Sequence, residues 1–389
     1  MLACTVHGIW FIFLCVCQRA SYTNIALGIS GLPAELSIRI MNDCGSLQDV
    51  WSLIQASPHV LRCYAANREH ITQPHINRLR DICGSRIPAS AFLAAQLRHI
   101  RGNLSPHCDI GDLEAAIRPA LEQYQPNKDN RTWPANLPLL SALTEAVAAT
   151  DLMASRYALK VWEKELRRRV RVSRCRVLHG LPPYPLGQEP RPLELSIAER
   201  YRFNDAFFRY EAFCQAFFRD GSFLFKHDEE FRRRFFTSQK RISRFYPAVY
   251  YILFQHRDIM QNVFEVPDKS FESTSSMDYP HSQQWSWAET RHYLHYVTSQ
   301  GLDLLISLQQ MTRKRRQHVI LETFRQAQQS DQFVTFIMED GYRAFEPFRG
   351  GRGWTPWVER GRGSAQPWGV DGSYSYALYY WDKQRQMRE

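Results

Sequence analysis

Apolar residues recur every three or four positions along most of the chain, which is the spacing of amphipathic helices. The spacing is clearest over residues 31–72 and 88–180, where it gives apolar sides to DLEAAIRPALEQY and LLSALTEAVAATDLMASRYALK. The alternation typical of strands is scarce, and VTFIM at 334–338 is its best example. No fixed-period repeat is visible. The pattern therefore predicts a mainly α fold with irregular helix packing rather than a regular solenoid.

The N-terminal end of this pattern predicts three short helices. The first begins at Leu32-Pro33, because proline is tolerated in the first turn, where its missing N–H has no helical partner. Leu36 and Ile40 are four positions apart and share one apolar face, which Ile38 and Met41 widen. Gly45 stands where a helix commonly ends with a residue in the left-handed conformation.

A capping box predicts the start of the second helix. Ser46 precedes Asp49 by three positions, so each side chain can accept a hydrogen bond from the other's backbone N–H. Pro58 ends or kinks this helix, and a third helix covers roughly residues 59–71. Three helices of this length bury little surface alone, so they need a partner or the rest of the chain. The second helix has these apolar residues on one side: Leu47, Val50, Leu53 and Ile54.

A second capping box, Ser196 with Glu199, opens an aromatic helix. Its aromatic and cysteine residues are spaced alternately four and three apart, which places them on one helix face and is typical of a protein core rather than a cofactor site. Further helices are expected over 229–262 and 286–328, with a polar loop at 266–284 between them. The face comprises Phe203, Phe207, Tyr210, Cys214 and Phe217.

Composition along the chain suggests a division into six parts. GLPPYPLGQEPRP at 180–192 breaks the helical pattern, because its five prolines remove backbone donors. The predicted parts are an apolar leader at 1–28, a three-helix module at 29–72, a helical region at 73–180, a proline-rich linker at 181–194, an aromatic-rich helical domain at 195–340, and a Gly/Arg/aromatic tail at 341–389 that ends in a helix.

The leader has three interpretations. The run IWFIFLCVC at 9–17 has the length of a signal-peptide core and is too short to span a bilayer, but no basic residue precedes it and no clear cleavage site follows. A buried strand or helix, or a mispredicted start codon, also fits. Nine scattered cysteines with no paired spacing indicate a reducing compartment, so we expect a cytoplasmic or nuclear protein whose body has no segment of transmembrane length.

The net charge of +10 is compatible with an ordinary solvated basic surface or with an acidic partner. Its most concentrated stretches are LRRRVRVSRCR at 166–176 and RKRR at 313–316, which is typical of a nuclear-import signal or a phosphate contact. Two Arg-Gly clusters beside tryptophans in the tail suggest RNA binding, because arginine and aromatic rings stack on bases.

The sequence lacks the motifs of common catalytic sites, namely GxSxG, GxxxxGK[ST], HExxH and GxGxxG. His292 and His295 are three positions apart but have no evident third ligand. We therefore expect a protein that is not an enzyme and that needs neither a metal nor another cofactor.

The N-terminal helices resemble the F-box, in the divergent form common in filamentous fungi. The family pattern opens with Leu-Pro-x-Glu-Leu, continues through an apolar helix, and reaches Asp-Leu-x-x-Leu in the second helix. Here LPAEL at 32–36, IRIM at 38–41, and Asp49-Val50 with Leu53 occur in that order and spacing. The sequence departs from the family at Ala56-Ser57-Pro58, where a small residue, a basic residue and an aromatic residue are usual.

Two later segments are also similar to this fungal group. They are ERYRFNDAFFRYEAFCQAFF at 199–218 and SYALYYWDKQRQ at 375–386, so the resemblance is discontinuous over residues 31–387. The resemblance implies a non-enzymatic subunit of a cullin–RING ubiquitin ligase, which docks a Skp-type adaptor through the N-terminal helices and recruits a substrate protein. The residues that match the family's adaptor-binding or module-core positions are Leu32, Pro33, Leu36, Ile40, Val50 and Leu53.

Two other functions remain open at the level of sequence. In one, the protein is a helical scaffold whose F-box-like helices are buried in its own core. In the other, the basic tail binds RNA. The exposure of Leu36 and Ile40 distinguishes the first of these from adaptor docking.

Overall fold

The computed structural model describes the chain in several stretches. They are residues 31–105, 107–124, 136–178, 193–220, 222–228, 231, 239–264, 293–294, 296–329 and 380–381. The predicted leader at 1–28, the strand-like VTFIM, His292 and His295, the loop at 266–284 and nearly all of the tail lie outside these residues.

The described residues are mainly α-helical, which confirms the predicted fold class. The helices are α2 (Ala34–Asp43), α3 (Leu47–Ala56), α4 (Pro58–Ala66), α5 (Arg68–Cys83), α6 (Ala89–Asn103), α7 (Ile110–Gln123), α8 (Leu137–Leu178), α9 (Ile197–Phe217), α11 (Gln239–Phe264), α13 (Leu302–Gln310) and α14 (Arg313–Gln329). Strands β1 (Phe218–Arg219) and β2 (Ser222–Phe223) form a small antiparallel hairpin directly after α9.

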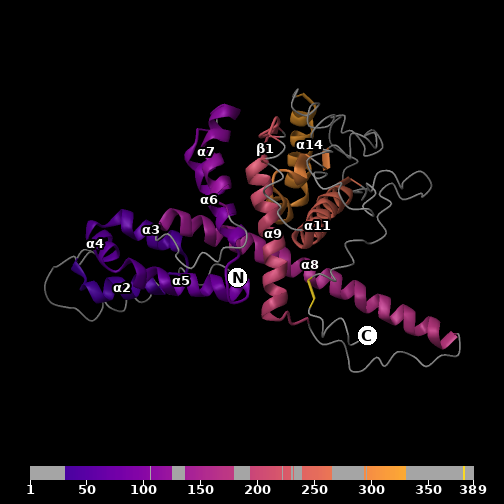
Figure 1. The fold of residues 1–389 in the computed structure, drawn as a ribbon, viewed down its shortest axis with the longest axis horizontal. Helices are drawn as coiled ribbons and strands as arrows, with labels where there is room; N and C mark the ends of the chain where they lie inside the picture. Colours follow the sequence, from indigo (N-terminus) through magenta and orange to yellow (C-terminus); the bar gives the residue numbers. More distant parts are fainter. Residues whose placement is uncertain are drawn as a thin grey trace, which may run out of the picture.

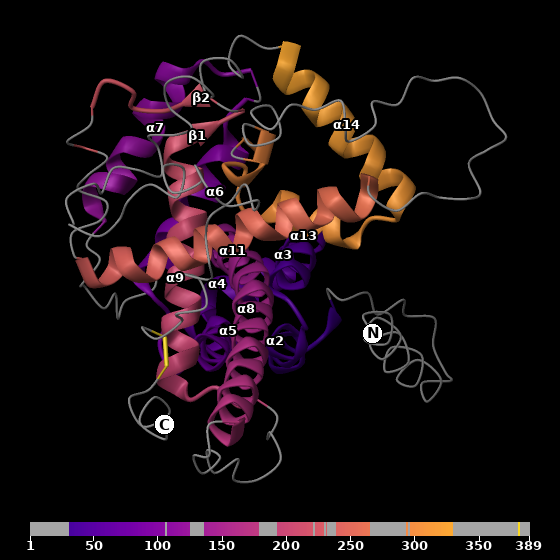
Figure 2. The same ribbon diagram turned by 90° about the vertical axis from the view of Figure 1, so that its right-hand side faces the viewer.

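Two core clusters divide the helices, and α8 passes through both (Figure 1). At one end, α2–α5 pack with α6 and the first half of α8. At the other end, α7, α11, α13 and α14 surround α9, and Figure 2 shows α11 lying across α8 and α9. Because α6, α8 and α9 contribute to both clusters, the N-terminal module is continuous with the rest of the protein. The predicted module boundary at residue 72 falls inside α5.

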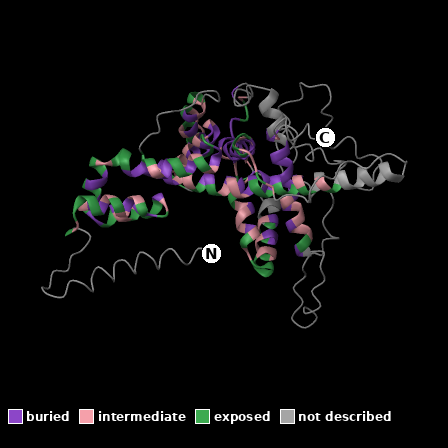
Figure 3. Cartoon of the chain, turned by 90° about the horizontal axis from the view of Figure 1, so that it is seen from below, coloured by how far each residue is buried: buried purple, intermediate pink, exposed green. Residues whose placement is uncertain are grey.

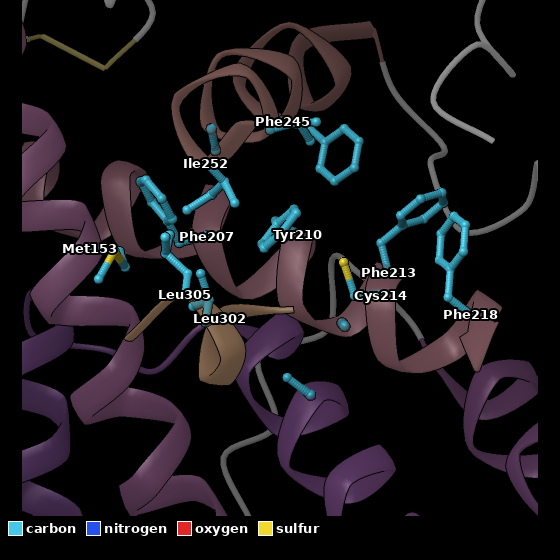
Figure 4. Packing of buried hydrophobic residues seen from close by; sticks show 14 of the residues in the cluster. Met153, Phe207, Tyr210, Phe213, Cys214, Phe218, Phe245, Ile252, Leu302 and Leu305 are labelled. Atoms are coloured by element: carbon cyan, nitrogen blue, oxygen red, sulfur yellow. The ribbon is translucent and has the colours of Figure 1, made fainter. Parts of the chain in front are cut away.

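Helix α9 is buried on nearly every side, and all five residues of its predicted apolar face lie in the core. Figure 4 shows Phe207, Tyr210 and Phe213 of α9 beside Phe245 and Ile252 of α11. The capping box at the start of α9 is present, with Glu199 N donating to Ser196 Oγ at 3.1 Å. The aromatic helix of the sequence is therefore the central element of the larger core.

This core also contains a buried ion pair. Arg98 Nη2 lies 2.7 Å from Glu211 Oε1, and Leu302 N donates to Glu211 Oε2 at 2.8 Å. Burial alone would raise the pKa of Glu211, but Arg98 and these hydrogen bonds hold the pKa below its ordinary value. Gly301 is required here, since it has a φ of +82° and a Cβ at this position would meet Glu211 Oε2 at 2.9 Å.

The predicted third helix at 59–71 is wrong in one respect, because the chain forms two helices there. Helix α4 ends at Asn67, whose backbone N–H donates to the carbonyls of Cys63 and Tyr64, and α5 begins at Arg68. The expected role of Gly45 is also wrong. Helix α2 ends at Cys44 with extended backbone, and Gly45 does not adopt the left-handed conformation.

Helix α8 is longer than the sequence pattern suggests. It runs unbroken for 42 residues, which is about 63 Å. Contrary to expectation, its part from Leu137 to Glu163 is long and apolar enough to cross a membrane. Its most apolar window is 56% buried inside the protein, and this part of α8 packs on α3, α5, α6 and α9.

Candidate docking surface

The first predicted helix, α2, packs into the protein through a narrow side. Ser37, Met41 and Cys44 are spaced four and three positions apart, and all three are buried. This buried side is offset by one residue from Leu36 and Ile40, the apolar pair identified in the sequence. The offset leaves that pair outside the core.

The apolar pair lies on an accessible side of α2. Leu36 is 48% exposed, Pro33 is exposed, and Leu32 and Ile40 are partly buried. Figure 3 shows exposed and buried residues alternating around α2–α5, at the end of the molecule far from α11 and α14. The LPAEL segment therefore presents accessible apolar surface at one end of the protein.

The two remaining predicted residues, Val50 and Leu53, lie on the second helix, α3, and differ in burial. Val50 is fully buried and packs in the same core as Leu140 and Leu143 of α8. Leu53 is partly buried at the edge of that core. Of the six predicted site residues, Val50 therefore belongs to the module core, whereas Leu32, Pro33, Leu36, Ile40 and Leu53 all keep some accessible surface.

Helix α3 begins with the predicted capping box. Asp49 N donates to Ser46 Oγ at 3.1 Å, and Ser46 N donates to Asp49 Oδ2 at 3.2 Å. Farther along, Ser141 Oγ of α8 donates to Gln48 Oε1 at 3.0 Å. These contacts fix the start of α3 against α8, so the module has a set orientation on the protein.

Basic side chains of α5 hold the C-terminal end of α2. His75 Nε2 lies 3.4 Å from the carbonyl oxygen of Met41, and Arg78 Nη1 donates to the carbonyl of Cys44 at 3.4 Å. Such contacts satisfy carbonyls that have no helical partner. Burial lowers the pKa of His75, while its bond to Met41 opposes that shift. Helix α2 is thus held at its end while its outer side stays accessible.

A shallow polar depression borders the other flank of α2. Its lining mixes both charges with amide groups, in contrast to the apolar side that carries Leu36. The lining residues are Glu35, Ile38, Arg39, Asn42, Asp43, Asn67 and His70. Apolar and polar surfaces therefore lie on two sides of the same exposed helix.

A second exposed leucine, Leu61 on α4, was not identified from the sequence. It is 49% exposed, and α4 packs directly on α2. The buried side of α4 consists of Val60, Cys63 and Tyr64. The helical spacing of these three residues is the sequence signal that would have placed Leu61 on the opposite, exposed side. Accessible leucine side chains thus occur on two adjacent helices of the module.

The RKRR cluster forms the first turn of α14, and two of its arginines contact neighbouring helices. Arg316 donates to the carbonyls of Leu308, Gln309 and Met311 at the end of α13, at 2.7, 3.2 and 3.0 Å. Arg313 donates to the carbonyl of Val263 on α11. This cluster therefore joins three helices. The Arg-Gly clusters of the tail lie outside the described residues.

The described residues contain no group of three or more His, Cys, Asp or Glu side chains arranged to hold a metal. Burial raises the pKa of the Cys44 thiol to about 11 and that of Cys83 to about 12. Thiols in this state are poor nucleophiles at neutral pH.

Comparison with known proteins found no matching family model, no matching curated protein and no matching solved structure.

Proposed function

We propose that this protein is an F-box-like substrate-recruiting subunit of a cullin–RING ubiquitin ligase, and that it docks a Skp-type adaptor through α2. The observation that supports this most directly is the 48% exposure of Leu36 in the LPAEL segment. A helix whose apolar residues served only its own core would turn Leu36 inward. Here the core of the module is complete without it.

Burial of such a surface by a partner would be favourable. Fully burying a leucine side chain contributes about 1.5–3 kcal/mol of favourable free energy. Because Leu36 is 48% exposed, a partner that covered it could gain about half of that free energy. Leu32, Pro33 and Ile40 would extend the contact along one side of α2. An apolar helix side of this kind is the usual element of helix-in-groove recognition.

The remaining helices would present the substrate. Helix α8 joins the docking end to the aromatic core around α9 and continues beyond it. An unbroken helix shared by two cores acts as a stiff connection, so a substrate bound at the far end would be held at a fixed distance from the adaptor.

The test compares two leucines of equal exposure. Leu36→Glu changes the proposed docking side, and Leu159→Glu changes an exposed residue of α8 that is 49% accessible. A charge at the centre of an apolar contact is costly to bury. We expect purified Skp-type adaptor to bind the wild type and the Leu159→Glu protein equally, and to bind Leu36→Glu at least tenfold more weakly, as measured by isothermal titration calorimetry.

Absence of adaptor binding to the wild type, or equal binding to all three proteins, would refute docking through α2. The second candidate function, a free-standing helical scaffold, would then be favoured. Its support is the complete burial of Val50 against α8, which makes the module part of the protein's own core.

A further inference from the structure

Arg118 of α7 lies against two aromatic rings that follow the β1–β2 hairpin. Its guanidinium carbon is 5.0 Å from the centroid of the Phe225 ring and 4.6 Å from that of the Phe231 ring. The two ring centroids are 4.8 Å apart, and the ring planes meet at 51°. Both cation distances fall within the roughly 6 Å over which a ring face attracts a positive charge. We call this arrangement of Phe225 and Phe231 the aromatic corner, and Figure 2 shows α7 beside the hairpin.

Two carboxylates stand beside the aromatic corner. Asp228 Oδ2 lies 3.4 Å from Arg118 Nη1, and Glu122 Oε1 lies 3.9 Å from the same nitrogen. The side chains of Asp228 and Glu122 are 40% and 57% exposed, so solvent reaches this part of the corner. Ring faces and carboxylates both favour a positive charge. The corner is therefore an accessible site for a cation.

The protein core fixes the two walls of the corner. Phe225 and Phe231 are 2% and 9% exposed, and Phe225 packs edge-on against Phe217 of α9. The backbone N–H of Phe225 donates to Glu114 Oε1 of α7 at 2.6 Å. The backbone N–H of Phe231 donates to Asp228 Oδ1 at 3.0 Å. A cation that enters the corner thus meets a preformed site, which lowers the entropic cost of binding.

The backbone of Phe225 adopts the left-handed conformation, with a φ of +55°. A bulky residue in this region is an outlier, and it persists only where its surroundings impose it. Glycine would form the same turn without strain, but it would supply no ring. Strain of this kind is concentrated at functional sites. The strained turn therefore points to a use of the Phe225 ring beyond packing.

Arg118 occupies the corner loosely. Its side chain is 40% exposed, and its ion pairs of 3.4 and 3.9 Å are longer than the about 2.7–2.9 Å of a direct charge-assisted hydrogen bond. By contrast, the buried Arg98 lies 2.7 Å from Glu211. Exposed ion pairs of the looser kind contribute little to stability. Departure of the Arg118 guanidinium would leave both rings and Asp228 in place.

We propose that the aromatic corner binds a methylated lysine side chain of a partner protein, and that Arg118 fills the corner until that side chain enters. Aromatic rings recognise methylated ammonium groups through cation–π attraction. An unmodified lysine ammonium is strongly hydrated, and ring faces cannot replace its water hydrogen bonds. A partner's arginine offers only the group that Arg118 already supplies, and Arg118 has the advantage of belonging to the same chain.

The local charge favours a methylated lysine over the choline headgroup of a lipid. Choline carries the same methylated ammonium, but a lipid phosphate lies next to it. The carboxylates of Glu114, Glu122 and Asp228 surround the corner and would repel that phosphate. A methylated lysine brings no negative charge of its own, so it fits these surroundings better.

The experiment measures binding of the full chain to a short fluorescein-labelled Gly-Ser peptide with one central trimethyl-lysine, by fluorescence anisotropy. The variant R118Q removes the occupant, and glutamine keeps helix propensity. If Arg118 fills the corner for about 90% of the time, its removal should raise the apparent affinity about tenfold. The double variant R118Q/F231L should bind at least about tenfold more weakly than R118Q, because leucine keeps an apolar wall but has no ring face.

The matched control is R86Q, because Arg86 also lies over a ring, that of Tyr201 at 4.3 Å, but outside the aromatic corner. It should leave affinity within about twofold of the wild type, since distant sites act independently. Circular dichroism checks that each variant keeps its helix content. None of these measurements depends on adaptor docking, since α7 and α2 pack in different core clusters.

Several results would overturn the proposal. They are equal gains in R118Q and R86Q, no binding of the peptide by R118Q, and unchanged affinity in R118Q/F231L. Equally tight binding of R118Q to the same peptide with unmethylated lysine or arginine would also contradict it. So would tighter binding of R118Q to phosphatidylcholine vesicles than to the trimethyl-lysine peptide.

Discussion

At the scale of single residues, burial decides what the polar side chains of this protein do. Glu211 is fully buried yet keeps a lowered pKa, because Arg98 and the backbone N–H of Leu302 compensate for its lost hydration. His256 on α11 is the opposite case. It is 3% exposed, and its Nε2 has no hydrogen-bond partner among the described residues. Burial of Glu211 is therefore compensated by its partners, whereas burial of His256 favours its neutral form without compensation.

His256 should make the protein sensitive to acid. Burial lowers the pKa of His256 from 6.5 to about 3, so the unfolded state binds a proton that the folded state does not. Its contribution to stability is complete above pH 6.5 and is lost as the pH falls from about 6.5 towards 3. Between pH 7 and pH 5, protonation of this histidine in the unfolded state should lower the free energy of unfolding of the wild type by about 2 kcal/mol. We expect His256→Leu to abolish this decrease, as measured by urea unfolding at the two pH values. Gln255→Leu, at a partly buried position of the same helix, removes no titratable group and should leave the pH dependence as it is in the wild type.

At the scale of elements, helix ends are set by local residues, whereas the side that faces the core is set by packing. Ser46 and Ser196 both begin helices through capping boxes that the sequence predicts. In contrast, the sequence places Leu36 and Ile40 at the centre of the apolar side of α2 and Met41 at its edge, whereas the protein buries Met41 together with the polar Ser37. A difference of one residue rotates a helix by about 100°, which is enough to exchange core and surface.

The capping box of α3 gives a prediction at this scale. Ser46→Ala removes the acceptor for Asp49 N and should lower the free energy of unfolding by about 1 kcal/mol. Gln55→Ala is the control, because Gln55 is exposed in the same helix. Its effect should stay within about 0.5 kcal/mol in the same urea titration. A loss for Gln55→Ala as large as that for Ser46→Ala would contradict a specific role of the cap.

At the scale of the whole molecule, Tyr380 and Trp381 of the C-terminal aromatic segment pack against the aromatic helix α9. Tyr380 is fully buried and stacks on Phe203 of α9 with ring centroids 4.4 Å apart. Its carbonyl oxygen accepts a hydrogen bond from Arg202 Nε at 2.7 Å. Trp381 lies against both Phe203 and Trp162 of α8. Residues from the last tenth of the chain therefore complete a core built by α8 and α9.

Removal of this contact should destabilise the entire protein. We expect Tyr380→Ala to lower the free energy of unfolding by about 3–5 kcal/mol, the range for aromatic-to-alanine changes in a core. Tyr201→Ala, at a partly exposed position of α9, should cost less than half as much in parallel guanidinium titrations. If the two substitutions cost the same, Tyr380 would not be a member of the core.

The sequence by itself determined the helical class, the capping boxes, the apolar side of α9 and the existence of an N-terminal helical module. Each of these depends on residues within one or two helical turns, whose spacing and capping act locally. It also located the LPAEL segment, but not which of its residues stay accessible.

The tertiary structure alone decided three matters. It put Val50 in the core and left Leu36 accessible, it joined the module to the rest of the chain through α8, and it brought Tyr380 onto Phe203. All three depend on contacts between residues roughly 90 to 180 positions apart, or on the rotation of a helix against its neighbours. Local periodicity specifies that a helix has an apolar side. Only packing against other elements determines how much of that side is buried.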